Sequence, residues 1–343
     1  TRESPTVEPV WVMPAKEGHS MFRILKKFAL IISASALVIG GLSGCSGGDA
    51  TPDEVTVVTH DSVVFTDEVI KAFKDETGIT IKQIKAGDAG AMTNKLVLTK
   101  DVPIGDAFFG IDNTFSGVAM DNEIVDGAME PVDYGDVCFN YDKTWFTNHE
   151  QAAPETIKDL TKPEFKGLTV VENPSTSSTG LSFLIATVGA FGADKWTKYW
   201  EDLKANDVRI DAGWEEAYNV NFSGSAGKGN YPIVLSYSSS PAFEENTASI
   251  DDGCFRQTEY AGLLTGGSQV DGAKKFIDFL LSDSFQKTIP DSMYMYPVST
   301  KVALPEAWST KAPAASNAIS VDSKQINANR STWLKAWDAI FKN

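Results

Sequence analysis

The sequence contains few of the residues that metal binding and covalent catalysis require. Three of its 343 residues are Cys and three are His, and the histidines, His19, His60 and His149, lie far apart. No two cysteines have the spacing of a zinc site. Neither a Walker phosphate loop nor a Gly-x-Gly-x-x-Gly turn is present. These absences argue against a metalloprotein or a nucleotide-dependent enzyme, and we expect no catalytic residue, no metal and no cofactor.

Basic residues are scarce as well. The chain has 30 Lys and Arg against 46 Asp and Glu, which gives a net charge of −16 at pH 7. Residues 1–44 contain five of the basic and three of the acidic residues, so the remainder carries −18. Such a surface repels nucleic acid and anionic lipid head groups, and we expect no nucleic-acid partner. The net charge does not restrict a small ligand, because one pocket of an acidic protein can be locally positive.

The sequence also lacks a hydrophobic run of the length that a transmembrane helix needs. Its N-terminal apolar run, residues 28–42, follows Arg23, Lys26 and Lys27 and ends in small residues. A spanning helix would need roughly 20 apolar residues. A basic segment, a short apolar run and a Leu-Ser-Gly-Cys ending are typical of an export signal whose cleavage leaves a lipid-bearing cysteine.

We therefore predict a lipoprotein signal peptide over residues 21–44, a lipid on Cys45 and a flexible tether over residues 45–53. Residues 1–20 have no periodic pattern and are interpreted as an upstream translation artefact. The alternative is an uncleaved anchor helix. Both interpretations place the folded part outside the cytoplasm, attached to the cell membrane.

Two cysteines remain once Cys45 is assigned to lipid. Outside the cytoplasm an even pair usually forms a disulfide, which predicts a bond between Cys138 and Cys254. Two buried free thiols or one reactive thiol are the alternatives.

From residue 54 onward, strand-like and helix-like segments alternate, which argues for an α/β fold with largely parallel sheets. The predicted strands are 55–59, 79–84, 106–110, 137–141, 168–171, 208–211, 233–236 and 257–264. The predicted helices include one through Val69 and Phe73 and others over 92–98, 181–191, 195–205, 215–222, 272–281 and 331–341. A Gly-, Pro- and Asp-rich passage, 126–136, separates two of the strands.

This order predicts two lobes joined by hinge strands near 134–141 and 257–264. Lobe 1 comprises residues 54–133 and 265–343, with C-terminal flanking helices that pack on it or partly on lobe 2. Lobe 2 comprises residues 134–264.

Hydroxyl-rich stretches follow two predicted strands of lobe 2. Residues 173–180 place five Ser and Thr before a helix, where free N–H groups favour an anion; the alternative is a simple helix cap. Residues 236–241 repeat the pattern after another strand. Trp214 begins a helix and offers a flat face for a ring or a cation, although it could equally pack a lobe edge.

Taken in order, these stretches resemble the thiamine-binding substrate-binding proteins of bacterial ABC importers. The resemblance is carried by residues 59–62, 110–113, 133–135, 141–143, 174–181, 213–218, 235–242 and 289–298. It implies a two-lobed periplasmic-binding-protein-like fold of type 2, with a ligand cleft that closes on thiamine or its mono- or diphosphate. The ligand-binding residues that it implies are Asp88, Ala89, Ser177, Ser178, Trp214, Tyr237, Ser238, Ser239, Ser240 and Tyr294.

The chain departs from the enterobacterial members at three of these places. Residues 87–90 read Gly-Asp-Ala-Gly where they carry an acidic pair followed by Gly, so Ala89 is the departure there. Tyr294 replaces a Trp, and Ser175 replaces an Arg. The last change removes a cation beside the hydroxyl-rich loop and could weaken a preference for phosphate.

The expected function is that of a monomeric, lipid-anchored receptor that delivers thiamine or a thiamine phosphate to an ABC transporter permease and catalyses no reaction. One alternative is a thiaminase I-like enzyme with Cys138 as its nucleophile. Another is a receptor for ferric ion or a polyamine. The absence of a Tyr-Tyr pair disfavours ferric ion, and the Ser-rich stretches favour a ligand with an anionic group over a polyamine.

Overall fold

The computed structural model describes residues 54–342. The predicted upstream segment, signal peptide, lipidated Cys45 and tether lie outside the described residues. Among the helices of residues 54–342, none combines the length and the apolar character that a bilayer crossing needs.

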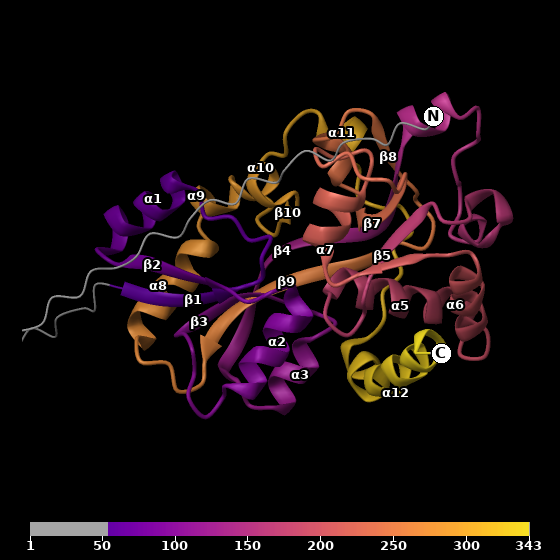
Figure 1. The fold of residues 1–343 in the computed structure, drawn as a ribbon. Helices are drawn as coiled ribbons and strands as arrows, with labels where there is room; N and C mark the ends of the chain where they lie inside the picture. The colour runs from indigo at the N-terminus through magenta and orange to yellow at the C-terminus, as the bar shows by residue number, and fades with distance from the viewer. Residues whose placement is uncertain (1–53, 343) are drawn as a thin grey trace, which may run out of the picture. The chain divides into compact units, whose positions relative to one another are not determined.

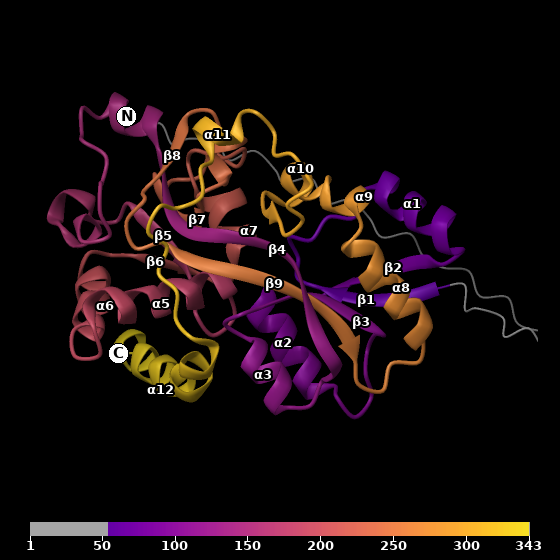
Figure 2. The ribbon, with the colours of Figure 1, turned by 180° about the vertical axis from the view of Figure 1, so that it is seen from behind.

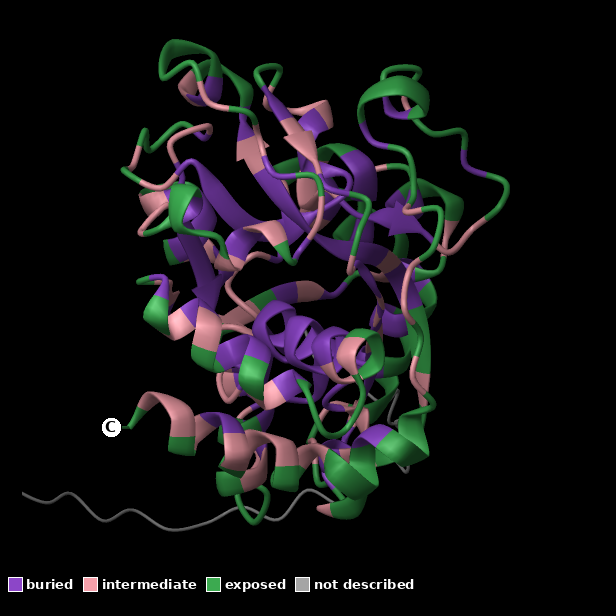
Figure 3. Ribbon diagram, turned by 90° about the vertical axis from the view of Figure 1, so that its right-hand side faces the viewer, coloured by how far each residue is buried: buried purple, intermediate pink, exposed green. Residues whose placement is uncertain are grey.

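One mixed sheet organises these residues, in the order β2-β1-β3-β9-β4-β7-β5-β6 (Figures 1 and 2). Its first half consists of parallel strands β1 (Glu54–Thr59), β2 (Thr80–Lys85) and β3 (Ala107–Asp112). Its second half consists of β5 (Thr169–Glu172), β6 (Arg209–Asp211) and β7 (Ile233–Tyr237), in which β5 is parallel to both neighbours. The predicted strands and their largely parallel pairing are confirmed. Strands β3, β5 and β7 are buried along their whole length. In Figure 3 several strands in the upper part of the view are purple, the colour of buried residues.

Helices pack around each half of the sheet. The first half carries α1 (Asp67–Thr77), α2 (Ala89–Leu98), α3 (Ser116–Asp121) and α8 (Val270–Leu280). The second half carries α5 (Ser178–Phe191), α6 (Trp196–Ala205) and α7 (Trp214–Glu216), the last continued by a π-helical turn over Ala217–Asn221. Shorter elements are α4 (Lys143–Asn148), β8 (Thr247–Ser249), α9 (Asp283–Gln286), α10 (Ile289–Met293), β10 (Tyr296–Pro297) and α11 (Trp308–Lys311).

Helix α1 shows how the sequence sets these boundaries. The Thr66 side chain caps its first turn by accepting from the Val69 N–H, and Gly78 ends it at φ 76°, a left-handed conformation that suits glycine. Its apolar face carries Phe73, which packs edge-on against Phe279 of α8 at 5.4 Å between ring centroids. Capping therefore fixes the ends of the helix, and aromatic burial fixes its position on the sheet.

Two long strands connect the halves. Strand β4 (Val125–Asp142) pairs with β7, and β9 (Phe255–Leu264) pairs with both β3 and β4 (Figures 1 and 2). The Gly-, Pro- and Asp-rich passage 126–136, which we expected to separate strands, is part of β4. Register shifts between Asp126 and Glu130 and between Pro131 and Asp133 place these residues at irregularities of the ladder, where a proline is tolerated.

The two predicted hinge segments, 134–141 and 257–264, are confirmed as strands that cross the centre of the sheet. The exact lobe boundaries at 133/134 and 264/265 stay predictions.

Helix α12 (Ser323–Phe341) contacts both halves on one side of the sheet (Figure 2). Its Trp337 packs against Trp200 of α6 at 5.8 Å between ring centroids. At its other end, Asn327 Nδ2 donates to Asp121 Oδ2 of α3 at 2.9 Å. The predicted flanking helix is thus confirmed, although it begins eight residues earlier than expected.

The predicted disulfide is present. Cys138 of β4 and Cys254, the residue before β9, are bonded with their Cα atoms 4.5 Å apart, and both are buried. The bond closes a segment of 116 residues that contains the whole second half of the sheet. It therefore ties the two connecting strands together on that side.

Replacing both Cys138 and Cys254 by Ala should lower the free energy of unfolding by about 2–4 kcal/mol, because the open chain gains conformational entropy when it unfolds. Urea titrations of the wild type and the variant would measure the difference. Reducing agent should lower the midpoint of the wild type and leave that of the variant unchanged. Equal midpoints for the reduced and oxidised wild type would contradict a stabilising bond.

Candidate functional site

A small buried cavity lies where the carboxyl ends of strands from both halves meet. Side chains that follow β1, β2, β5 and β6 reach it, together with that of Tyr237 at the end of β7, as expected for a ligand site of an open α/β sheet. We call it the inner cavity; it is lined by His60, Ser62, Asp88, Ser178, Thr179, Trp214, Tyr237, Glu259, Met293 and Met295. Its volume of about 30 Å³ is comparable to the space of one water molecule in the liquid.

An outer cavity of about 270 Å³ adjoins the inner one. Ser62, Asp88 and Trp214 line both cavities and form the wall between them. A movement of Trp214 or Asp88 would join the two spaces into one of the size that small-molecule sites usually have, about 300 Å³ or more.

Asp88 connects the two halves of the sheet through its carboxylate. It caps α2 of the first half, where its Oδ1 accepts from the Ala89 N–H at 2.7 Å. The same Oδ1 accepts from the N–H of Ser178 in the second half at 3.1 Å. Its Oδ2 accepts from the Trp214 N–H at 2.9 Å and from Ser177 Oγ at 3.1 Å. Burial raises the pKa of Asp88, and these donors oppose that rise.

Trp214 has one face covered and its indole N–H bonded. Its ring stacks on Tyr218 at 4.9 Å between centroids, and its Nε1 donates to Ser236 Oγ at 2.9 Å. Tyr237 lies across the inner cavity, where its hydroxyl donates to Gln257 Oε1 at 3.1 Å. Trp214 therefore packs on Tyr218 and also presents a fixed aromatic surface to the cavities. Its position is compatible both with packing and with contact to a ligand, the two roles that the sequence allowed.

His60 and Glu259 form an ion pair at the floor of the inner cavity, with Nε2 and Oε1 3.2 Å apart. Burial alone would lower the pKa of His60, but the nearby carboxylates of Glu259, Asp88 and Asp61 raise it above its usual value. Gly110 makes room for the imidazole: a Cβ there would lie 2.1 Å from His60 Cδ2, and its φ of +107° also favours glycine. Neither His60 nor Glu259 was predicted as a site residue; the position of His60 directly after a strand was the available signal.

Glu259 also belongs to a row of three buried carboxyl groups across the connecting strands. It is in register with Asp112 of β3 on one side and Asp133 of β4 on the other. Burial raises the pKa of Asp112 to about 7, with a further rise from Glu259 and opposition from the Thr114 hydrogen bond. Burial and Glu259 also raise the pKa of Asp133 well above its usual value. The row therefore carries fewer than three charges at neutral pH.

The remaining predicted residues do not line either cavity. Ala89 and Ser177 are buried beside Asp88, and Ser240 Oγ is 2.9 Å from Ser236 Oγ. The Ser239 hydroxyl donates to the Tyr294 carbonyl, while the Tyr294 ring stacks on Phe243 at 4.0 Å.

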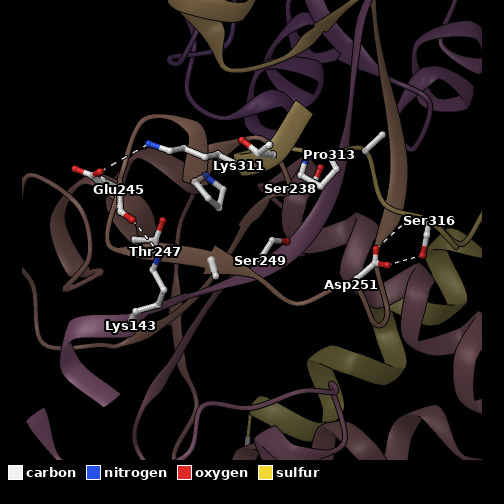
Figure 4. A pocket seen from close by; sticks show the side chains of 13 residues that line it. Lys143, Ser238, Glu245, Thr247, Ser249, Asp251, Lys311, Pro313 and Ser316 are labelled. Carbon is white, nitrogen blue, oxygen red and sulfur yellow. Dashed lines mark hydrogen bonds and ion pairs between the residues drawn. The ribbon is translucent and has the colours of Figure 1, made fainter. Parts of the chain in front are cut away.

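Ser238 faces away from the cavities. It lines a separate pocket of about 460 Å³ together with residues such as Lys143, Ser249 and Asp251 (Figure 4). Of the ten predicted ligand-binding residues, the structure brings Asp88, Ser178, Trp214 and Tyr237 to the inner cavity.

Residues 111–322 match a family described as bacterial extracellular solute-binding protein. The chain belongs to this family. The thiamine-binding periplasmic protein of Salmonella typhimurium is 30% identical over 312 residues, covering 82% of this chain and 92% of the relative. The protein of the same name from Brucella abortus is 26% identical over 337 residues, covering 90% of this chain and 98% of the relative.

Solved structures confirm the fold of this solute-binding protein. A periplasmic thiamin binding protein superimposes with a TM-score of 0.76 at 26% identity, covering 86% of this chain and 98% of that one. Iron-bound HitA from Pseudomonas aeruginosa, at 16% identity and a TM-score of 0.67, shares the fold alone. The predicted two-lobed fold with a cleft between the lobes is therefore confirmed, and the solute-binding protein acts outside the cytoplasm.

The stability of the solute-binding protein should depend on pH through Asp112. A carboxyl group with a higher pKa in the folded state binds its proton more tightly when folded, so its ionisation destabilises the fold as pH rises from about 4 to about 7. The difference between the two pKa values corresponds to about 4 kcal/mol as an upper bound.

Asp112→Asn should therefore be more stable than the wild type by a margin that is larger at pH 8 than at pH 5, as measured by urea titration. The exposed Asp75→Asn serves as the control and should follow the wild type at both pH values. An Asp112→Asn curve parallel to the wild type between pH 5 and pH 8 would disprove the assignment.

Proposed function

We propose that this protein is an extracytoplasmic receptor that binds thiamine in the cleft and delivers it to the permease of an ABC importer. The observation that carries the proposal is the pairing of an aromatic wall with carboxylates at one cavity. Trp214 offers its face, while Asp88 and Glu259 supply negative charge. Thiamine presents the complementary chemistry, an aminopyrimidine ring and a thiazolium cation. The thiamine-binding proteins that the chain resembles in sequence support the same ligand.

Ligand entry requires the two halves to separate. The inner cavity, at about 30 Å³, is too small for a molecule with two aromatic rings. Opening would break the bonds from Asp88 to Ser178 and Trp214, and the ligand would then occupy the combined space of the inner and outer cavities. In the proposal, β4 and β9 act as the hinge strands between lobe 1 (54–133 and 265–343) and lobe 2 (134–264). A lipid on Cys45 would tether the monomeric receptor to the membrane beside its permease.

The alternative of a thiaminase I-like enzyme requires Cys138 as a free nucleophile. Cys138 is bonded to Cys254 and lies in the sheet, so it offers no thiolate to attack thiamine. The relatives reported above are named as binding proteins. A receptor that returns its ligand unchanged fits both observations.

The polyamine alternative is favoured by one observation. Carboxylates beside an aromatic ring would also suit a linear polycation, and the Ser-rich stretches that argued for an anionic ligand are occupied by bonds within the protein. Spermidine is therefore the competitor to test against thiamine.

Calorimetry of the purified protein, unfolded and refolded to remove carried-over ligand, should show thiamine binding with 1:1 stoichiometry. The thiamine recovered afterwards should be intact. Tighter binding of spermidine, or no heat with thiamine, would refute the proposed ligand. Cleaved thiamine would refute a pure receptor.

Trp214→Ala should weaken thiamine binding about 30-fold, which corresponds to about 2 kcal/mol for the loss of a stacking face. Trp145→Ala is the matched control, because Trp145 stacks on His149 at 3.8 Å and lines neither cavity. Its affinity should equal that of the wild type. An unchanged affinity of folded Trp214→Ala would remove this residue from the site.

A further inference from the structure

Among the described residues that line the two cavities, His60 is the only basic one. The same described lining contains neither Lys nor Arg but five carboxylates, those of Asp61, Asp88, Glu215, Glu216 and Glu259. The side chain of His60 is 13% exposed and that of Glu259 is 5% exposed, so water and salt screen their interaction weakly. A proton on His60 therefore changes the charge of the inner cavity more than a proton on a surface histidine would.

The two nitrogen atoms of the His60 ring have different partners. Nε2 lies 3.2 Å from one carboxylate oxygen of Glu259 and 3.3 Å from the other. Nδ1 accepts a hydrogen bond from the Ser62 N–H at 3.2 Å. A main-chain N–H only donates, so this bond forms when Nδ1 carries no hydrogen and Nε2 carries one. The loop after β1 thus stabilises a neutral ring that is still bonded to Glu259.

Charged groups on three elements favour the protonated ring instead. Burial lowers the pKa of His60, but three carboxylates raise it by more, those of Glu259, Asp88 and Asp61. They belong to β9, to the start of α2 and to the loop after β1. Lys85 at the end of β2 opposes them weakly, because it is exposed and contacts this loop at the Asp61 carbonyl, 2.6 Å away. His60 is therefore balanced between two protonation states.

Glu259 is the carboxylate of the inner cavity that a ligand cation would meet. The other carboxylate there, Asp88, already accepts four hydrogen bonds from the protein. Asp112 and Asp133 are in register with Glu259 on β3 and β4, and mainly burial, with a smaller contribution from Glu259, raises the pKa values of both. Neither can neutralise Glu259. A ligand cation therefore competes with protonated His60 for this carboxylate.

We propose that His60 exchanges charge with the ligand: it pairs with Glu259 as a cation in the empty cleft and loses its proton when the thiazolium enters. This inference rests on the proposed function. The Nδ1 proton passes to solvent, Nδ1 then accepts from the Ser62 N–H, and Nε2–H stays on Glu259. The cavity thus holds one positive charge before binding, on the imidazolium, and one after binding, on the thiazolium.

Calorimetry of thiamine binding, in buffers of equal pH and different ionisation enthalpy, counts the released protons. At pH 6 the wild type should release about 0.7 to 1 proton per thiamine, since a pKa above about 6.5 leaves most of His60 protonated there. By linkage, the dissociation constant should fall at least about 4-fold between pH 6 and pH 8. The thiazolium is a permanent cation, so its own charge does not change over this range.

His60→Gln keeps an N–H donor toward Glu259 but cannot take up a proton. It should release less than about 0.2 proton per thiamine at pH 6, and its dissociation constant should change less than about 2-fold between pH 6 and pH 8. The affinity itself should fall, because His60 lines the inner cavity, so the proton count and the pH dependence are the readouts.

Two variants serve as controls. His149→Gln removes an exposed histidine that stacks on Trp145 at 3.8 Å and lines neither cavity. Asp112→Asn removes the neighbouring carboxyl group whose pKa is about 7 and which could also lose a proton when a cation arrives. Both controls should release at least about 0.6 proton per thiamine at pH 6.

Proton NMR of the imidazole groups provides a test that does not depend on His60→Gln folding. The His60 signal is assigned by elimination, with single replacements of the other two histidines by Gln. Saturation with thiamine should lower its titration midpoint by at least about 1 pH unit and leave the other midpoints unchanged.

The outcomes separate the two proposals. Thiamine binding without proton release, or an unchanged His60 midpoint, would overturn the inference and leave the thiamine receptor intact. Release that persists in His60→Gln, or that disappears in Asp112→Asn or His149→Gln, would assign the proton to another group and overturn the role of His60. Absence of thiamine binding at every pH would refute the proposed function itself.

Discussion

The carboxylate of Asp88 is the contact on which the closed arrangement of the site depends. It belongs to the first half of the sheet, yet two of its four hydrogen bonds reach main-chain N–H groups of the second half. Main-chain donors have fixed positions, so the bonds define one relative placement of α2, α5 and Trp214. The position of the aromatic wall and the small volume of the inner cavity follow from that placement.

Buried carboxyl groups on and beside the connecting strands destabilise the folded state, because they lose their hydration. Asp112, Glu259 and Asp133 are buried side by side, and the ion pair that the described residues form with this row is that of Glu259 with His60. Apolar residues at these places would pack without a desolvation penalty. Buried ionisable groups with shifted pKa values are more frequent at functional sites, where stability is exchanged for activity. In this protein the destabilising buried carboxyl groups lie beneath the inner cavity, on strands β3, β4 and β9.

Much of the fold could be predicted because strands and helices leave strong local patterns, and the disulfide followed from the count of cysteines. The passage 126–136 was misjudged because Gly, Pro and Asp are typical of loops, whereas register shifts let β4 accommodate them. The structure brings Asp88, Ser178, Trp214 and Tyr237 to one cavity. The last three were named because they end or follow predicted strands, and Asp88 was named because of the resemblance to the thiamine-binding family. Glu259 was missed because its role comes from its neighbours across the sheet. The direction of Ser238 depends on how the chain turns after β7, which composition does not encode.

The bond between Cys138 and Cys254 makes the structure of the protein depend on the redox state of its compartment. It clamps β4 to the residue before β9, beside the ladder pair of Val137 and Phe255, so the two strands cannot slide past each other there. A chain held in a reducing compartment would lack this clamp. The second half of the sheet is therefore tied covalently to β9 only once the protein has reached an oxidising compartment outside the cytoplasm.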